Sequence, residues 1–462
     1  MKKFKSTIIL GIILVVLVVY AYVFEFLGGK KKQEAEEAAK KVFHFNKIDV
    51  EEIYIKRQEK ENPEILFKKI TGIWWLKKPL NYKADKSFID GLLSNFEVAE
   101  IKRTIKDTTD LKKFGLNPPQ AIYIIKHKDG VDTLYIGNKN PVGNYTFAMK
   151  PARDRVFLTY NAMLDKSKST IFEYRDKSVL EFESSRINRI YLKAPRRNFE
   201  LVKASVDSWE LKKPVSSKAD KSEVDKILNK VKNTKVRKFV EEEPKSLRKY
   251  ALNRPFIKLE LIQSPNDAKK TLFIGKKKNG NYYAKDDSRK PVFLVDSTLV
   301  NRLMVNLFTL RDKTVIDSKR KDIDKIELVY PDTTIVCEKD TANNWKIITP
   351  KEGRGKSWKI NGIISDLEYL RVEKFLRYRK SRKKSYGLDK PAIEVVFSVK
   401  DSVIEKILLG KKVKIKDKEQ RYFYNSTRGK LYLVKNSIYN DLKFHVNDLI
   451  EEQVKEEGKK EK

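Results

Sequence analysis

The stretch W-W-L-K-K-P-L-N-Y-K-A-D-K-S, Trp74 to Ser87, decides the fold because the chain contains it twice. The second copy is W-E-L-K-K-P-V-S-S-K-A-D-K-S, Trp209 to Ser222, in which the tryptophan, the proline and the K-A-D-K-S string are all displaced by 135 positions. A weaker third copy keeps Trp345 and Pro350 at the same spacing. Self-similarity at a fixed period predicts a tandem repeat.

Other landmarks recur in the same order, as a duplication of the whole unit requires. L-Y-I-G-N-K ends at Lys139, and its counterparts end at Lys277 and Lys412. Two further strings recur: F-G-L-N-P-P at 114–119, with copies at 250–255 and 386–391, and V-F-L-T at 156–159, with copies at 292–295 and 431–434. The whole unit is therefore expected to occur three times.

Each unit reads as a small α+β domain. In the first unit, an alternating strand at 50–55 precedes two short apolar runs around Thr71-Gly72, which predict a hairpin. Asp85 suits the N-cap of a helix with an apolar face, and Asp220 with Glu223 has the spacing of an acidic capping box. Further alternating runs follow, so we expect a mostly antiparallel sheet with about two helices in each unit.

The copies divide the chain into segments of different character. We expect a membrane anchor, a charged stalk, three repeat units and a charged tail, at 1–29, 30–45, 46–185, 186–321, 322–450 and 451–462. Units of about 136 residues have the commonest domain size.

The start of the chain predicts one transmembrane helix. Residues 8–24 form an unbroken apolar run behind the basic start M-K-K-F-K, and about 20 helical residues cross the hydrocarbon of a bilayer. A cleaved signal peptide is the rival, but no small-residue cleavage site follows the run. Lysines lie on both sides of it and their count leans slightly towards a cytoplasmic body; long domains can translocate regardless of charge, so the side of the membrane stays open.

The composition is strongly basic, with 100 Lys and Arg against 63 Asp and Glu and a net charge of +37. Such a charge raises the suspicion of an anionic partner. Lysines and acids are nevertheless interleaved over most of the length, without an arginine-rich arm at either end. A solvated, lysine-rich surface is the favoured interpretation.

Two motifs resemble phosphate-binding elements. G-R-G-K-S at 353–357 matches the end of a phosphate-binding loop, but Pro350 stands where the leading glycine is needed, so we interpret it as a repeat linker. The strand-ending glycines, Gly137, Gly275 and Gly410, precede lysines that could grip a phosphate, Lys139, Lys277 and Lys412. A positive φ at a strand exit explains these glycines without a ligand.

The other chemistry-bearing residues have structural explanations. Trp74, Trp75 and Trp209 are expected to pack over a helix rather than to form a stacking platform. Cys337 lies in an alternating run, which indicates a half-buried strand position. The recurring carboxylates Asp85, Asp220, Asp176 and Asp312 lie at element boundaries, and the three histidines, His44, His127 and His445, lack metal-site spacing. We assign no catalytic, cofactor or metal residues.

The combination W-x-L-K-K-P, K-A-D-K-S, F-G-L-N-P-P, L-x-I-G-x-K and V-F-L-V resembles the bacterial family called domain of unknown function 4340. The resemblance covers nearly everything after the stalk and is weakest in the third unit, which lacks K-A-D-K-S. Members of that family often have one N-terminal anchor and are encoded beside permease and ATPase subunits of ABC transporters, including gliding-related systems. The resemblance implies an accessory subunit whose body lies outside the cytoplasmic membrane.

These observations lead to a membrane-anchored, non-enzymatic envelope protein that scaffolds an ABC-type transport system. The alternative, motivated by the charge, is a binding module for an anionic polymer or lipid headgroups, whose affinity would fall with salt. Nucleic acid is disfavoured because it needs a cytoplasmic body. An enzyme would need a deep pocket in one unit with polar residues that its sister units lack.

Overall fold

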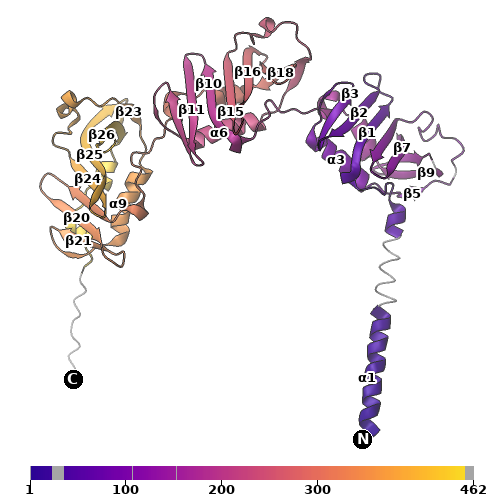
Figure 1. Ribbon diagram of the computed structural model, residues 1–462, viewed down its shortest axis with the longest axis horizontal. Helices are drawn as coiled ribbons and strands as arrows, with labels where there is room; N and C mark the ends of the chain where they lie inside the picture. Colours follow the sequence, from indigo (N-terminus) through magenta and orange to yellow (C-terminus); the bar gives the residue numbers. More distant parts are fainter. Residues whose placement is uncertain (1, 23–35, 107, 152, 453–462) are drawn as a thin grey trace. The chain divides into compact units, whose positions relative to one another are not determined.

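The computed structural model describes residues 2–22, 36–106, 108–151 and 153–452 (Figure 1). Three nine-stranded sheets follow one another along the chain, and their strands pair antiparallel. This confirms the predicted tandem repeat of antiparallel sheet units. The predicted residues 23–29 of the anchor, 30–35 of the stalk and 453–462 of the tail lie outside the described residues.

The first helix is α1 (Lys2–Ala21), and its apolar side chains from Ile12 to Tyr20 are exposed. Among the described residues, no helix is both long and apolar enough to cross a membrane. At the other side of the undescribed stretch, Val42 and Phe43 are buried in the core of the first repeat.

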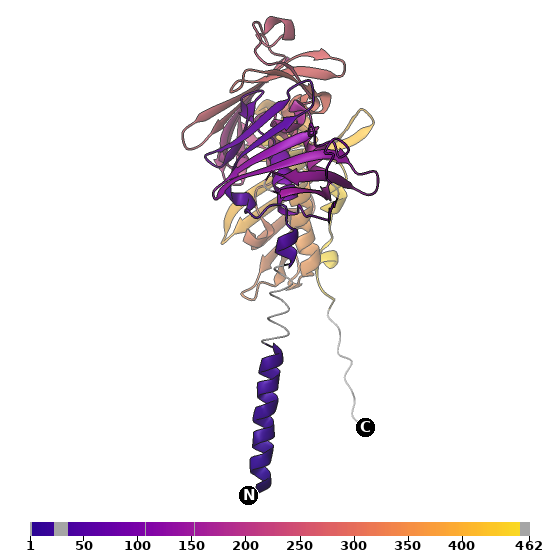
Figure 2. The same ribbon diagram turned by 90° about the vertical axis from the view of Figure 1, so that its right-hand side faces the viewer.

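The first repeat has the sheet order β4-β3-β2-β1-β6-β7-β8-β9-β5. In Figure 2 the strand directions of this sheet change steadily across the view, as in other twisted sheets. Its elements are η2 (Lys47–Asp49), β1 (Val50–Arg57), β2 (Glu64–Ile70), β3 (Ile73–Lys78), β4 (Tyr82–Lys83), α3 (Lys86–Glu97), β5 (Arg103–Thr104), β6 (Ala121–His127), β7 (Gly130–Lys139), β8 (Tyr145–Lys150), β9 (Arg153–Tyr160), α4 (Ala162–Ser167), α5 (Ile171–Tyr174) and η3 (Ser184–Arg186).

The second repeat has the equivalent order β13-β12-β11-β10-β15-β16-β17-β18-β14. Its elements are β10 (Ile187–Ala194), β11 (Arg197–Ser205), β12 (Ser208–Lys213), β13 (Ser217–Ala219), α6 (Lys221–Asn233), β14 (Lys238–Glu241), η4 (Arg248–Tyr250), β15 (Ile257–Gln263), β16 (Ala268–Lys278), β17 (Asn281–Asp286), β18 (Val292–Asp296), α7 (Ser297–Leu303), α8 (Leu307–Leu310) and η5 (Arg320–Asp322).

The third repeat has the order β22-β21-β20-β19-β24-β25-β26-β27-β23. Its elements are β19 (Lys325–Val329), β20 (Thr334–Lys339), β21 (Trp345–Thr349), β22 (Gly353–Arg354), α9 (Ser357–Tyr369), β23 (Lys374–Leu376), η6 (Lys380–Arg382), η7 (Lys384–Tyr386), β24 (Ile393–Val399), β25 (Ser402–Ile415), β26 (Lys418–Asn425), β27 (Lys430–Lys435), α10 (Ile438–Asp441) and α11 (Val446–Leu449).

The core of each repeat lies between the long helix and one face of the sheet. In β1, Ile53 and Ile55 are fully buried with Phe88 and Leu92 of α3, while Tyr54 between them is only half-buried on the opposite face. Alternation along a strand produces this division. We call the face away from the long helix the outer face.

Each repeat contains one long helix and two short ones among the described residues, rather than about two helices. Asp85 caps α3 by accepting from the Phe88 N–H at 2.9 Å, and Asp220 caps α6 by accepting from the Glu223 N–H at 3.2 Å. These caps agree with the sequence pattern.

The capping box predicted at Asp220 does not form. The Asp220 N–H donates to the Leu310 carbonyl at 2.9 Å, so it is not available to Glu223. The Glu223 carboxylate pairs with Arg302 at 2.9 Å instead. A tertiary contact therefore replaces the local one.

The chain forms two compact units that do not coincide with the three repeats. One comprises Met1–Val179, Lys235–Glu242 and Pro291–Val295, and the other comprises Leu180–Thr234, Glu243–Lys290 and Asp296–Lys462. The first unit therefore includes β14 and most of β18.

Arg175 is one of the residues that attach β14 to the first unit. Its guanidinium lies 3.5 Å from the centre of the Phe239 ring and forms two bonds to the Glu242 carboxylate, at 2.6 and 3.1 Å. Within the second unit, Arg311 lies 3.5 Å from the Phe375 ring in the same way. The outermost repeats lack one half of this contact: Thr104 occupies the Phe239 position of β5, and Ile450 occupies the Arg175 position.

Candidate functional site

The recurring glycines Gly137, Gly275 and Gly410 do not lie at strand exits and do not have positive φ, so the sequence-based explanation was wrong. Each lies inside a long strand against the carbonyl oxygen of the recurring turn. A Cβ at these positions would lie 2.1, 2.1 and 2.3 Å from the oxygens of Phe114, Tyr250 and Tyr386. Close approach of two backbone segments, rather than a ligand, requires glycine here.

The lysines that follow these glycines are not arranged to grip a phosphate. Lys139 pairs with Asp165 at 2.8 Å, and Lys412 pairs with Glu419 at 2.5 Å. Lys277 is exposed at the end of β16. Two of the three candidate cations are therefore already neutralised.

The segment 353–357 is a repeat linker, as the sequence indicates. Gly353 lies in β22 and Ser357 begins α9. The N–H of Gly355 donates to the Trp345 carbonyl at 2.8 Å, and that of Lys356 donates to Leu449 at 2.6 Å. A phosphate-binding loop needs such N–H groups free.

The recurring carboxylates form a structural contact that we call the clasp: residues 174–178 against 83–85 in the first repeat, and 310–314 against 218–220 in the second. Asp85 pairs with Lys177 at 2.6 Å and Asp220 pairs with Lys313 at 2.9 Å. Asp176 and Asp312 accept from the backbone N–H two residues on, at 3.1 and 3.0 Å. The sequence placed these residues at element boundaries but did not bring them together.

The remaining candidates are divided between the core and the surface. Trp74 and Trp209 pack on the helix side of their sheets, but Trp75 lies on the outer face beside Lys68. Cys337 is fully buried, and burial raises the pKa of its thiol to about 12.

The histidines do not converge. His127 lies 3.3 Å from Asp132, while His44 and His445 are exposed. The described residues contain no group of three metal-ligating side chains.

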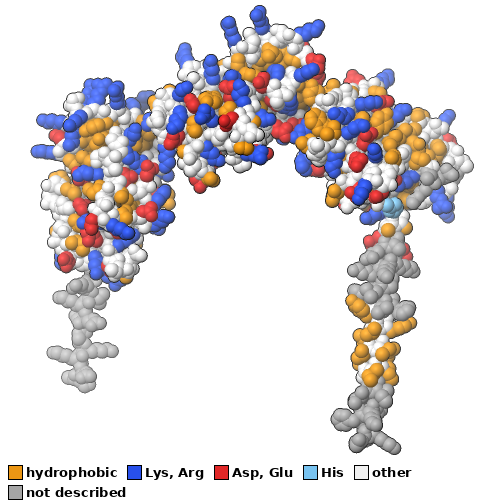
Figure 3. Space-filling model, viewed as in Figure 1, with side chains coloured by type: hydrophobic (Ala, Val, Ile, Leu, Met, Phe, Trp, Pro, Cys, Tyr) orange, Lys and Arg blue, Asp and Glu red, His pale blue; other side chains and the backbone are white. Residues whose placement is uncertain are grey.

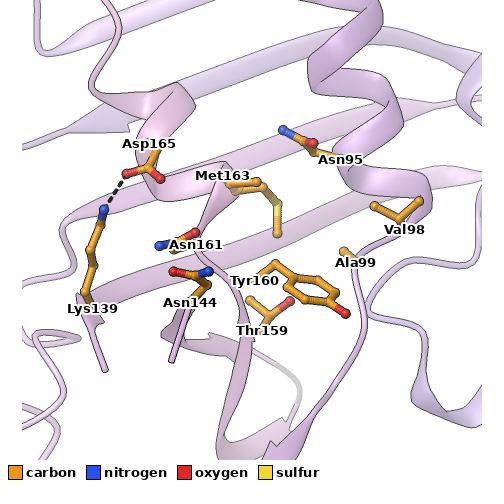
Figure 4. A pocket seen from close by; sticks show the side chains of 11 residues that line it. Asn95, Val98, Ala99, Lys139, Asn144, Thr159, Tyr160, Asn161, Met163 and Asp165 are labelled. Atoms are coloured by element: carbon orange, nitrogen blue, oxygen red, sulfur yellow. Dashed lines mark ion pairs between the residues drawn. The ribbon is translucent and has the colours of Figure 1, made fainter. Parts of the chain in front are cut away.

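A pocket that the recurring motifs did not indicate lies in the first repeat, with a volume of about 550 Å³ (Figure 4). One side is formed by the end of α3, with Asn95, Val98 and Ala99, and the opposite side by the Lys139–Asp165 ion pair. Between them lie the other lining residues, Asn144, Thr159, Tyr160, Asn161, Ala162 and Met163. The volume lies within the range of about 300–1,000 Å³ for small-molecule sites.

Hydrogen-bonding capacity in this pocket is largely unused. The side-chain amides of Asn95, Asn144 and Asn161 make no hydrogen bond to any described residue. Asn161 precedes α4, but its side chain does not cap that helix. Each amide offers two donors and an acceptor, so the three together can bind several polar groups of a ligand.

Thr159 marks the pocket as unusual. Its side chain is fully buried and its hydroxyl has no hydrogen-bond partner, although the neighbouring Thr146 hydroxyl donates to the Asn138 carbonyl at 2.9 Å. Buried hydroxyls are normally paired, and exceptions call for an explanation. The equivalent positions in the second and third repeats carry buried valines, Val295 and Val434.

The sister repeats lack this arrangement. Counting from the helix N-caps, Asn95 corresponds to Lys230 and Asp366. Counting from the last long strand, Asn161 corresponds to Ser297 and Asn436, and Asn436 already accepts from Arg421 at 3.0 Å. Comparing the copies position by position would have singled out Asn95 and Thr159 as specific to the first repeat, but not the pocket that they line.

In the third repeat, by contrast with Thr159, the buried carboxylate of Glu405 has hydrogen-bond donors. Glu405 is 3% exposed and accepts from the Asp317 N–H at 2.8 Å, from Asn425 at 2.5 Å and from Arg428 at 2.9 Å. These donors satisfy the carboxylate, so its role is structural.

The sequence reading also missed a basic loop, Arg377–Lys384. Six of its eight residues are Lys or Arg, all six are exposed, and none forms an ion pair with a described residue. The equivalent stretch of the second repeat, 136 positions earlier, starts with three glutamates at 241–243. Composition counted in short windows, rather than over the whole chain, would have found it.

Neither the curated proteins nor the solved structures contain a significant match to this chain. One family model matches it in three overlapping segments, at residues 74–214, 209–391 and 345–460, which begin at the recurring Trp74, Trp209 and Trp345. The chain therefore belongs to the family described as Domain of unknown function (DUF4340).

Proposed function

We propose that this protein is a membrane-anchored, non-enzymatic envelope protein that acts as an accessory or scaffold subunit of an ABC-type, gliding-related transport system. The observation that carries the proposal is that the outer face of the central strands recurs in all three repeats and stays partly exposed. Tyr54, Tyr191 and Glu327 occupy equivalent, half-buried positions there. Repeated copies of one surface suit the binding of an extended partner.

Ion pairs cover much of these outer faces. They join Lys68 to Glu52 at 2.8 Å, Lys258 to Glu260 at 3.0 Å, and Lys325 to Glu338 at 2.7 Å. Figure 3 likewise shows Lys and Arg interleaved with Asp and Glu across the visible face. Such surfaces favour a polar protein partner over a uniformly anionic one.

A photo-crosslinking amino acid at Tyr54, Tyr191 or Glu327, introduced in intact cells of the source, tests the partner. We expect ABC permease or ATPase subunits in the crosslinked products identified by mass spectrometry. The matched control is Ser94, which is exposed on α3. Crosslinks that contain no transporter subunit, or that are equal at Ser94, contradict the proposal.

The proposed anchor rests on the apolar run 8–24 and on the exposed apolar side chains of α1. We expect the protein to stay with the membrane fraction after a high-salt wash, and Val15→Arg to release it, because a central Arg costs about 2.5–3.5 kcal/mol on insertion scales. Val206→Arg, at a position that is 81% exposed, is the control.

The side of the membrane is tested by protease added to intact spheroplasts. We expect digestion of the repeats without lysis, as for a body outside the cytoplasmic membrane. Protection would place the repeats in the cytoplasm and contradict the envelope assignment.

A second candidate function, binding of an anionic polymer or lipid headgroups, is favoured by the basic loop. Replacing Lys380, Lys383 and Lys384 with Gln would reduce binding to anionic vesicles and make the salt dependence less steep. Replacing Lys276, Lys277 and Lys278, which are exposed in the second repeat, removes the same charge and is the control. Equal losses in both variants would indicate non-specific attraction and reject the basic loop as a site.

A further inference from the structure

We propose that the pocket of the first repeat binds a neutral, polyhydroxylated ring such as a pyranose sugar. The proposal does not depend on the transport assignment. It rests on the composition of the lining, the unused hydrogen-bonding groups and their restriction to one of three homologous repeats.

The lining carries no net charge, so it favours a neutral ligand over an anionic one. Among the described residues that line the pocket, only Lys139 and Asp165 are charged, and their 2.8 Å ion pair neutralises both. This is notable in a protein with a net charge of +37. A phosphate or carboxylate would bind more favourably almost anywhere else on the surface, for example at the basic loop.

The polar groups match hydroxyls. The amides of Asn95, Asn144 and Asn161 come from three separate segments and make no hydrogen bonds to described residues. A hydroxyl both donates and accepts, as does a carboxamide, so adjacent hydroxyls of a sugar can pair with one amide in two directions. In Figure 4, Asn144 and Asn161 lie side by side next to the ion pair, while Asn95 lies across the pocket.

The apolar part of the lining matches the carbon face of a sugar ring. Met163 is buried between the two polar sides, Val98 is 58% exposed at the end of α3, and Tyr160 is 39% exposed. Sites of this kind combine an apolar wall with a few convergent polar groups. The ion pair Lys139–Asp165 can add one charge-assisted donor and one acceptor at the rim.

Binding to the full-length, detergent-solubilised protein tests the proposal. The probes are glucose and N-acetylglucosamine as free sugars, and cellohexaose and chitohexaose as glycan segments, followed by saturation-transfer NMR and calorimetry. We expect at least one probe to bind. Binding of free sugars indicates a soluble ligand, and binding of hexamers alone indicates recognition of a glycan chain.

Variants connect binding to the pocket. Asn161→Ala and Asn95→Ala should each weaken binding about tenfold, as expected for the loss of one or two hydrogen bonds. Ser297→Ala, at the equivalent position of the second repeat, should leave it unchanged. Glucose 6-phosphate should bind no more tightly than glucose.

Three results would overturn the proposal. One is that no probe binds at millimolar concentration. Another is that the bound probe is insensitive to both asparagine substitutions while circular dichroism shows the variants to be folded. A preference for glucose 6-phosphate would also contradict the neutral site.

Discussion

Thr159 and Val295 occupy the same place in two copies of one fold, so they allow the cost of an unpaired hydroxyl to be measured twice. Both side chains are fully buried. Because the Thr159 hydroxyl has no partner, Thr159→Val should raise the free energy of unfolding by about 1–3 kcal/mol. Denaturant unfolding followed by hydrogen exchange of β9 is the measurement.

The reverse substitution, Val295→Thr, is the matched control. It introduces a hydroxyl into the same apolar setting and should destabilise β18 by a similar amount. A loss of stability in Thr159→Val would mean that the hydroxyl has a partner in solution.

Two glycines of the third repeat should respond to alanine with opposite signs. A Cβ at Gly410 would lie 2.3 Å from the Tyr386 carbonyl oxygen. Gly410→Ala should therefore lower the free energy of unfolding by about 3 kcal/mol, at the upper end of the range for an overpacked site. Gly362 lies within α9 with open space around it, so Gly362→Ala should stabilise by about 1 kcal/mol. Thermal unfolding of both variants compares the effects; equal signs would contradict the close-approach explanation.

For single residues, the sequence identified several positions with a structural role but predicted the wrong physical reason for that role. It picked out Gly137 and its copies correctly as backbone requirements, but assigned them positive φ. Nothing local to a glycine reports that a carbonyl group from a turn more than 20 residues earlier lies against it. Thr159 was missed because a threonine at the end of V-F-L-T fits the alternating pattern of a strand as well as the valines of the other copies do.

Among the elements, α3 begins at a carboxylate cap whose pKa is lowered, whereas α9 begins at Lys356 without a side-chain cap. Burial alone would raise the pKa of Asp85, but hydrogen bonds from Lys177 and from the Phe88 N–H, with the charge of Lys177, lower the pKa below its ordinary value. A lowered pKa in the folded state adds stability above the unfolded value, and this stability is lost as the pH falls through the folded value.

We therefore expect amide protection in the first turn of α3 to decrease below about pH 4. The turn of α9 begins at Lys356, which makes no side-chain cap, so its protection should lack this component. Asp85→Asn, which keeps a capping oxygen, should lower protection of α3 at neutral pH and remove the dependence. A pH dependence that persists in Asp85→Asn would assign it to another group.

Single elements were predicted well where the pattern is local. The β2–β3 hairpin, its Thr71-Gly72 turn and the N-cap of α3 all form as expected. The clasp was not predicted, because Asp85 and Lys177 are 92 positions apart and belong to different motifs. Sequence repetition showed that both strings matter but could not show that they touch.

For the whole molecule, the contacts of Arg175 and Arg311 differ in whether the arginine also pairs with a carboxylate, and this difference should affect stability. Arg175 is 3% exposed and is paired with Glu242, whereas Arg311 has no carboxylate partner among the described residues and its Nε is unpaired. Burial lowers the pKa of Arg311. A hydrogen bond to a charged group contributes about 1.5–3 kcal/mol; Arg175→Met removes two of them to Glu242, whereas Arg311→Met removes none to a carboxylate of a described residue.

Arg175→Met should therefore expose β14 to hydrogen exchange more strongly than Arg311→Met exposes β23. Limited proteolysis within residues 176–186 should increase more in Arg175→Met than proteolysis within residues 312–322 increases in Arg311→Met. An equal effect of the two substitutions would show that the aromatic contact, and not the Glu242 pair, determines the stability of this region.

The number of repeats and their antiparallel sheets could be predicted from the sequence because the same strand, turn and cap motifs occur in each copy and support one another. The division into compact units could not, because it depends on tertiary contacts of 235–242 and 291–295 that no local pattern records. The pocket is the opposite case: it arises from differences between copies, which the search for shared landmarks discards.

The arginine contact also bears on how the copy number of such a chain can change. The second repeat carries both halves, Phe239 and Arg311, whereas the first repeat has Thr104 and the last has Ile450. Removing residues 187–322 would leave 64 positions between Arg175 and Phe375, the same separation as between Arg175 and Phe239. The spacing between the arginine and its aromatic partner is therefore the same with or without the middle repeat, so an internal copy can be gained or lost while the arginine keeps an aromatic partner.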